Sequence, residues 1–270
     1  MTELDERMEL AVSIALEAAA IPRRYFLNDA LVVDRKADNS PVTRADKEAE
    51  ELLRSRIEAT CPSDAIVGEE YDDKLGSSGY KWYLDPIDGT ESFVRGVPLF
   101  GTMVALNHGG DAIGGVIVFP ALGEIIYGSI GSGAWWATNV NDAVGIFELD
   151  RREAKVSSVS QLQDAGLSTT NLSHYFEKLG VEDQWQSLLR KVKVGRGFSD
   201  CYGHYLVATG RMDIMIDPEM NVWDNAPLLP IVVEAGGRFT NMAGVATIDG
   251  GSGVSTNGLL HDAVIAELRN

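Results

Sequence analysis

The chain has 270 residues, of which 45% are hydrophobic, and its formal net charge at pH 7 is −17. This length and composition predict a sizeable core, in one large domain or in two closely packed halves. The negative charge, with no run of Lys and Arg to reverse it, argues against nucleic acid or anionic lipid as partners. An anionic small substrate would need bound cations at its site.

The first helix and the loop after it are predicted from periodicity. Apolar residues between Leu4 and Leu16 recur at helical spacing, and Pro22 is expected to help end this helix. Residues 28–42 are interpreted as a loop. The same N-terminal segment is acidic and lacks a basic region followed by an apolar run, so it does not predict a secretory signal. No segment approaches the length of a membrane span.

A second helix is predicted from a capping pattern. Thr43 and Asp46 have the spacing of a capping box, and the apolar face that follows runs to about Cys61. We expect this helix to lie antiparallel to the first. Cys61 and Cys201 have neither disulfide nor metal-binding spacing, so they are interpreted as free thiols of a protein in a reducing compartment, the cytoplasm.

The pattern changes from residue 65 onward to short apolar runs separated by Gly and Pro, which is typical of strands. Several of these are expected to form one antiparallel sheet. Beyond an ambiguous stretch at 135–153, strands and helices alternate, which indicates α/β layering. We place a boundary near residue 150, between halves 1–150 and 151–270 of one compact unit. Strands are expected within 65–70, 81–89, 100–107, 112–120, 124–130, 166–171, 192–196, 213–217, 238–242 and 253–257, and helices near 175–190, 202–209, 224–235 and 259–268.

Acidic residues stand at the ends of predicted strands and at the start of a predicted helix. Glu69 and Glu70 follow one strand, Asp85 and Asp88 follow the next, and Asp224 opens a helix. These are the positions where α/β folds place their sites. Taken singly, each has an ordinary explanation, because Asp forms turns and caps helices and acidic pairs often face water.

Taken together, two long motifs resemble the paired signatures of the inositol monophosphatase superfamily: DPIDGTESF at 85–93 and WDNAPLLPIVVEAGG at 223–237. Shorter matches at 42–46, 68–70 and 206–213 extend the resemblance over nearly the whole chain. It implies an α/β (α+β) fold with αβαβα layers, and a homodimer. It also implies magnesium-dependent hydrolysis of a small, soluble phosphate monoester.

Such chemistry suits the first motif. Magnesium neutralises phosphate oxygens and lowers the pKa of bound water, and it prefers oxygen ligands. Pro86 is expected to stiffen the turn so that the carboxylates of Asp85 and Asp88 converge. Gly89 and Thr90 are expected to begin a helix whose free amides hold phosphate oxygens, together with Asp88.

The resemblance also implies a ligand set for two or three ions, of magnesium or alternatively manganese. One ion would be held by Glu69, Asp85 and the carbonyl of Ile87. A second would be held by Asp85, Asp88 and Asp224. A third, weaker ion would use Glu69 and water.

Catalytic roles follow from the same resemblance. Thr90, hydrogen-bonded to Asp46, would orient and deprotonate the attacking water. Glu69 is assigned as a third catalytic residue. Glu70 is placed just outside the ligands. Lys36 matches a basic loop position near the metal site, although an exposed Lys is equally often only solvated.

Some residues fit the pattern less directly. Glu91 adds a carboxylate close to the expected phosphate, and we expect it to point outward. Pro227 is expected in the first turn of its helix, where proline is tolerated. His174 and His204 are interpreted as structural or surface residues, and the tryptophans at 135–136 as a strand-edge or dimer contact.

The segments 195–224 and 93–98 look most like the histidinol-phosphatase branch, which implies a role in histidine biosynthesis. Histidinol phosphate carries a protonated amine and an imidazole, for which carboxylates are suitable partners. Asp200 and Asp217 fall where inositol-binding relatives contact the sugar ring, and they are assigned to substrate binding, with helix or turn capping as the alternative. The alternative enzymes are an inositol-1-monophosphatase or another small sugar phosphatase. A non-catalytic phosphate-binding relative is disfavoured, because every expected ligand is present.

Overall fold

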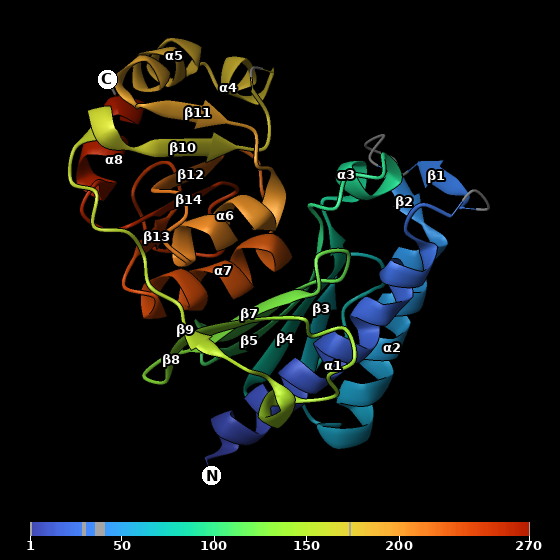
Figure 1. Cartoon of the computed structure of the whole chain (residues 1–270). Coiled ribbons are helices and arrows are strands. Elements are labelled where there is room, and N and C mark those ends of the chain that lie inside the picture. The colour runs from blue at the N-terminus through green and yellow to red at the C-terminus, as the bar shows by residue number, and fades with distance from the viewer. Residues whose placement is uncertain (1, 29–30, 36–40, 173, 270) are drawn as a thin grey trace.

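The computed structural model describes residues 2–28, 31–35, 41–172 and 174–269. Helices and sheets alternate in layers, in the order αβαβα that the resemblance implied (Figure 1). Helices α1 (Glu3–Tyr25) and α2 (Arg44–Thr60) form the first layer and a seven-stranded sheet the second. The third layer is α6 (Asp200–Ala208) and α7 (Val222–Glu234), and a five-stranded sheet follows. The outer layer contains α4 (His174–Lys178), α5 (Glu182–Lys191) and α8 (His261–Arg269).

The first layer differs from expectation at two places. Helix α1 continues past Pro22 to Tyr25, because a proline in the last turn removes a single hydrogen bond and Phe26 N still donates to the Pro22 carbonyl at 2.9 Å. The predicted loop at 28–42 contains a short antiparallel pair, β1 (Val33–Arg35) and β2 (Pro41–Thr43). Helix α2 begins after Thr43 with the predicted capping box to Asp46.

The seven-stranded sheet has the order β3-β4-β5-β6-β7-β8-β9, with β3 parallel to β4 and the other pairs antiparallel. Both faces are covered, one by α1 and the other by α7, which explains the continuous apolar runs in its sequence. In β6, Val116 and Val118 pack in the core beside α1, whereas Ile117 and Phe119 pack in the core beside α7. The strands are β3 (Ala65–Gly68), β4 (Tyr80–Asp88), β5 (Gly101–His108), β6 (Asp111–Phe119), β7 (Glu124–Ser129), β8 (Gly133–Thr138) and β9 (Arg152–Glu153).

The five-stranded sheet has the order β11-β10-β12-β14-β13. Helix α6 packs on one face, and α5 and α8 share an apolar core with the other face. The single helix predicted near 175–190 is two helices, since Gly180 between them has a φ of 71°. The strands are β10 (Gly166–Thr169), β11 (Val194–Arg196), β12 (Ile214–Asp217), β13 (Arg238–Thr240) and β14 (Gly253–Thr256), and short 3-10 helices span Ile146–Glu148 and Leu162–Asp164.

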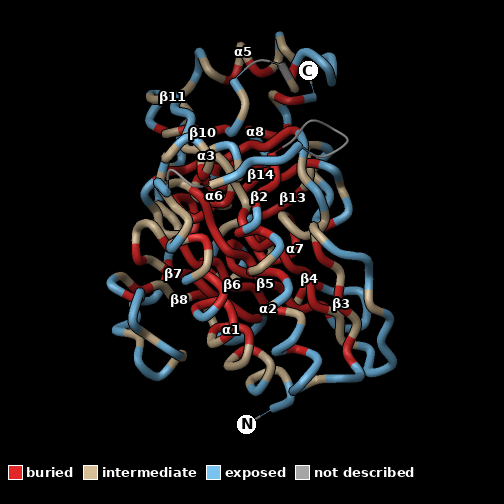
Figure 2. The backbone as a smooth tube through the Cα atoms, turned by 90° about the vertical axis from the view of Figure 1, so that its right-hand side faces the viewer, coloured by how far each residue is buried: buried red, intermediate tan, exposed pale blue. Residues whose placement is uncertain are grey.

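Helix α7 lies at the centre of the molecule, where buried backbone is concentrated (Figure 2). It begins at Val222 after the cap residue Asn221, earlier than predicted, so Pro227 lies in its second turn and not in its first. The helix approaches the first sheet closely, because a Cβ at Gly115 would lie 2.3 Å from the Pro227 carbonyl oxygen. Among the described helices, none is long and apolar enough to cross a membrane. Both cysteines are free.

Candidate active site

The two aspartates of the first motif converge because of a bulge in β4. Asp85 pairs with Met103 of β5 and Asp88 pairs with Gly101, so β4 has one residue more than its partner over this interval. Residues three apart in a regular strand point to opposite faces, and the extra residue brings both carboxylates to the same side. The bulge, whose interval contains Pro86, therefore makes the two carboxylates converge.

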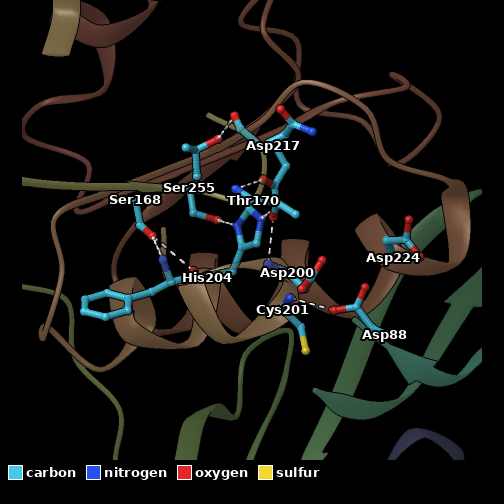
Figure 3. A network of polar contacts seen from close by, with 12 residues as sticks. Asp88, Ser168, Thr170, Asp200, Cys201, His204, Asp217, Asp224 and Ser255 are labelled. Atoms are coloured by element: carbon cyan, nitrogen blue, oxygen red, sulfur yellow. Dashed lines mark hydrogen bonds and ion pairs between the residues drawn. The ribbon is translucent and has the colours of Figure 1, made fainter. Parts of the chain in front are cut away.

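The third aspartate comes from the opposite layer. Asp224 is in the first turn of α7, and its Oδ2 accepts a hydrogen bond from the Asn221 amide at 2.7 Å, which completes a capping box. Oxygen atoms of Asp85, Asp88 and Asp224 all lie within 4.8 Å of one another. Figure 3 shows Asp224 and Asp88 approaching from α7 and from the sheet. The structure thus unites three of the predicted metal ligands.

Burial and mutual repulsion raise the pKa values of these carboxyl groups. The pKa is raised to about 7 for Asp88 and for Asp224, in both cases first by burial. Burial also raises the pKa of Asp85 well above its usual range, followed by the charges of Glu69 and Asp88. Carboxyl groups held this close favour a bound cation, and an all-oxygen donor set fits a hard divalent ion such as magnesium or manganese.

Glu69 lies at the end of β3, where its amide donates to the Leu84 carbonyl at 3.2 Å. Its charge contributes to the raised pKa values of Asp85 and Asp224, so it belongs to the same electrostatic cluster. The Ile87 carbonyl, the other predicted ligand, accepts a hydrogen bond from the Thr90 hydroxyl at 2.9 Å.

Glu50, a fully buried carboxylate on α2, was not among the residues predicted from the sequence. It accepts a hydrogen bond from the Glu70 amide at 2.8 Å and forms an ion pair with Arg54 at 2.7 Å. Gly68 lies against it, because a Cβ there would be 2.0 Å from Glu50 Oε1. Glu50 thereby fixes the turn that presents Glu69. Its only sequence signal was an acidic residue four positions before an arginine, which is common on exposed helices.

The predicted hydrogen bond between Thr90 and Asp46 is not formed among the described residues. Thr90 donates to Ile87 instead. Asp46 Oδ2 accepts from the amide and the hydroxyl of Thr43 at 2.8 and 2.6 Å, because capping α2 occupies that oxygen. Asp46 Oδ1 is buried without a hydrogen-bond partner among those residues, and burial raises the pKa of Asp46 to about 6.

Gly89 precedes α3 (Thr90–Val94), the helix predicted at this point, which is only one short turn. Its φ is 84°, which is the left-handed region that glycine tolerates. A Cβ here would also lie 2.9 Å from Asp200 Oδ2, so Asp200 reaches the first motif from the third layer.

Asp200 is the first residue of α6, and its φ of 56° is unusual for a residue with a side chain. Its amide donates to Thr170 Oγ1 at 2.7 Å, and the next amide, of Cys201, donates to Asp88 Oδ2 at 2.6 Å. Burial, and then the charges of Asp88 and Asp217, raise the pKa of Asp200 well above its usual range. This predicted substrate residue therefore lies beside the metal-ligand cluster.

Asp217 has a different environment from the one that substrate binding would require. It is 3% exposed, and its two oxygens bind protein groups: the Thr170 amide at 2.9 Å and His204 Nε2 at 3.2 Å. His204 is fully buried, as a structural histidine should be, and its Nδ1 lies 2.6 Å from Ser255 Oγ. Thr170 and Ser255 were not predicted from the sequence, because single hydroxyl residues near strands carry no distinctive signal.

The remaining sequence candidates are Glu91, the two tryptophans, Lys36 and His174. Glu91 points outward as expected: it is half exposed and pairs with Arg95 at 3.0 Å and Arg35 at 3.4 Å. The tryptophans at 135–136 are half-buried on β8, next to the edge strand β9. Lys36 and the side chain of His174 lie outside the described residues.

The family model for the inositol monophosphatase family matches residues 3–270. This chain belongs to the inositol monophosphatase family. Within it, the chain is 38% identical over 264 residues to the histidinol-phosphatase of Chlorobaculum parvum, which covers 97% of this chain and 96% of the relative. It is also 38% identical over 260 residues to the histidinol-phosphatase of Mycobacterium tuberculosis, which covers 96% of both. Among solved structures, the extragenic suppressor protein suhB of Bartonella henselae superposes with a TM-score of 0.85 at 25% identity and covers 97% of each chain.

Proposed function

We propose that this protein is a magnesium-dependent histidinol-phosphatase, which converts L-histidinol phosphate and water to L-histidinol and phosphate. The observation that carries the proposal is the cluster of Asp85, Asp88 and Asp224, whose oxygens lie within 4.8 Å of one another. The names of the relatives that match nearly the full chain support the substrate.

The residues present would hold ions at two places. Asp85, Asp88 and Asp224 would hold one, and Glu69, Asp85 and the Ile87 carbonyl would hold another. Bound magnesium neutralises phosphate oxygens and makes a ligated water more acidic. In this protein, β4, β3 and α7 would fix the ligand oxygens before substrate arrives, so little reorganisation is needed during the reaction.

The proton of the attacking water needs an acceptor, and we assign that role to Thr90 and Asp46. The buried Oδ1 of Asp46 has no hydrogen-bond partner among the described residues. With a pKa of about 6, the group is mostly ionised at pH 7 and can accept a proton. Thr90 would turn from the Ile87 carbonyl to pass the proton on. As the water oxygen bonds to phosphorus, the ester P–O bond breaks, and the leaving alkoxide takes a proton from solvent water to become the alcohol. The hydroxide that this leaves in solvent is neutralised when Asp46 releases the proton it accepted.

The substrate end of the site is assigned to Asp200. Its carboxylate lies against Gly89 and beside Asp88. It would therefore lie close to the alcohol part of a phosphate ester held by ions at Asp85, Asp88 and Asp224. A protonated amine there would stabilise the ionised carboxylate. A neutral sugar alcohol would leave that charge uncompensated.

The test is phosphate release from histidinol phosphate, inositol-1-phosphate and a hexose phosphate. After EDTA treatment we expect no turnover, and magnesium should restore it, with histidinol phosphate preferred. Asp224→Asn should be inactive, whereas Asp183→Asn, an exposed control on α5, should be unaffected. Preference for inositol phosphate would instead identify an inositol-1-monophosphatase. Activity in EDTA would refute metal dependence. Binding of phosphate without turnover of any ester would identify a non-catalytic relative.

The same proposal includes a cytoplasmic homodimer that serves histidine biosynthesis, with manganese as an alternative ion. The free state of Cys61 and Cys201 is compatible with a reducing compartment. Light scattering of the purified protein measures the oligomeric mass, and a monomer at micromolar concentration would contradict the dimer. Comparison of magnesium with manganese in the turnover assay decides the ion.

A further inference from the structure

A chain of hydrogen bonds reaches Asp200 from the second sheet (Figure 3). His204, one turn after Asp200 on α6, lies between Asp217 of β12 and Ser255 of β14. A carboxylate oxygen accepts hydrogen bonds, so His204 Nε2 donates to Asp217 Oδ2, and Nδ1 forms a hydrogen bond with the Ser255 hydroxyl. The imidazole is fully buried, and its orientation is fixed from both sides.

The chain continues to the backbone of Asp200. Asp217 Oδ1 accepts from the Thr170 amide at 2.9 Å, and Thr170 Oγ1 accepts from the Asp200 amide at 2.7 Å. Helix α6 is therefore tied to the second sheet at two of its residues, Asp200 through Thr170 and His204 through Asp217. Both carboxylate oxygens of Asp217 accept hydrogen bonds from the protein, one from the Thr170 amide and one from His204. We therefore assign Asp217 a structural role and not a contact with substrate.

Asp200 adopts a backbone conformation that needs such support. Residues with a Cβ rarely adopt a φ of 56°, and they persist there when the surroundings hold them. On the other side, the Cys201 amide donates to Asp88 Oδ2 at 2.6 Å, which ties the same turn to the first sheet. Held between the two sheets, the Asp200 carboxylate is directed at Gly89.

We propose that His204 and Asp217, acting through Thr170, are positioning residues that set the substrate preference of this site. They hold the Asp200 carboxylate where it binds the cationic end of the substrate, and neither touches the substrate. The inference rests on the proposed function, and it replaces direct substrate binding by Asp217. A carboxylate fixed in advance loses less freedom on binding than a mobile one, so the network favours the cationic ester selectively.

The test is a double-mutant cycle in the full-length protein with magnesium. The readout is the ratio of kcat/KM for histidinol phosphate to kcat/KM for inositol-1-phosphate. We expect His204→Leu and Thr170→Val each to lower this ratio about tenfold, the size of a charged hydrogen bond that loses its geometry. His204→Gln, which retains an N–H group, should recover much of the loss. In an Asp200→Asn background, His204→Leu and Thr170→Val should lower the ratio no further.

Thr170 is exposed, so Thr170→Val tests the link even if the buried His204→Leu variant fails to fold. Thr209→Val, at the far end of the same helix, is the matched control and should leave the ratio unchanged. Equal losses on both substrates, or losses that multiply with that of Asp200→Asn, would overturn the inference. A wild-type protein that hydrolyses neither ester, or prefers inositol phosphate, refutes the proposed function itself, and that result is read before any variant is compared.

Discussion

Asp46 has two carboxylate oxygens with different duties: one caps α2, and the other is buried without a hydrogen-bond partner among the described residues. If the second oxygen receives the proton from water through Thr90, Thr90→Ala should lower kcat about 100-fold, the lower range for general-base groups. KM should change little. Thr90→Ser, which retains the hydroxyl, is the matched control in a steady-state phosphate-release assay. Near-normal kcat for Thr90→Ala would assign water activation to another group.

Asp200 provides a test of the substrate. A charge-assisted hydrogen bond contributes about 1.5 to 3 kcal/mol, so Asp200→Asn should reduce kcat/KM for histidinol phosphate by roughly ten- to 150-fold. Inositol-1-phosphate, which has no amine, should lose much less. Glu219→Gln, an exposed carboxylate paired with Lys178, controls for the change in net charge. If both esters suffer alike, damage to the neighbouring metal ligands explains the effect and Asp200 does not read the amine.

Individual site residues were predictable where a motif or segment that matches the family contained them. The motif at 85–93 supplied Asp85 and Asp88, and the motif at 223–237 supplied Asp224. Glu50 and Ser255 could not be found in this way, because their importance depends on which distant backbone group they face. A hydrogen bond between distant residues leaves no local pattern, whereas a turn or cap does.

Helix α8 begins at His261, whose ring nitrogens contact hydroxyls on two strands: Thr240 of β13 at 3.1 Å and Thr256 of β14 at 3.0 Å. Burial lowers the pKa of His261 to about 4. The unfolded chain, with a pKa near 6.5, binds the proton more readily, so stability is complete above that value and falls as pH drops towards 4.

From pH 7 to pH 5 the contribution of His261 corresponds to a loss of about 2 kcal/mol in the free energy of unfolding. His261→Gln removes the titration, so its unfolding free energy should change less than that of the wild type over this interval. Urea unfolding of both proteins at the two pH values measures the difference, in which the carboxylates shared by both cancel. Parallel pH profiles would show that His261 is protonated equally in the folded and unfolded chains.

Helices and strands were predicted well where burial gives their sequence a clear apolar pattern. They were predicted poorly where a single residue or the partner strand determines the backbone. The short continuous apolar runs of the first sheet marked its strands, since the central strands such as β5 and β6 are buried on both faces. The end of α1 was misplaced, because proline in a last turn does not stop a helix. The break at Gly180 was missed, because apolar residues at helical spacing lie on both sides of it. The bulge at Asp85 depends on how β4 pairs with β5, and the sequence of β4 alone does not contain that pairing.

The backbones of two layers lie close together where α7 crosses β6. A Cβ at Gly115 would lie 2.3 Å from the Pro227 carbonyl oxygen and 2.6 Å from its Cα, both backbone atoms that cannot move alone. Gly115→Ala should therefore displace α7 and destabilise the protein by about 3 kcal/mol, the upper range of overpacking. Activity should fall too, since α7 carries Asp224.

Gly145→Ala is the matched control, because a Cβ there would meet no described atom within 4 Å and its backbone is extended. Thermal unfolding and the magnesium concentration for half-maximal activity are the two measurements. A Gly115→Ala protein with unchanged stability and magnesium requirement would mean that the two layers separate without cost to the site.

The two parts of the chain on either side of residue 150 pack against each other in the folded molecule. Helix α7, from residues 222–234, packs against β4 to β8, so the first sheet owes the cover on one of its faces to the late part of the chain. We expect residues 1–150 expressed alone to expose Met103, Ile117 and Ile126 and to aggregate. During synthesis, β4 to β8 are made before α7, so one face of their sheet stays uncovered until α7 follows. The carboxylates of Asp85, Asp88 and Asp224 therefore come together only after residues 222–234 have been made.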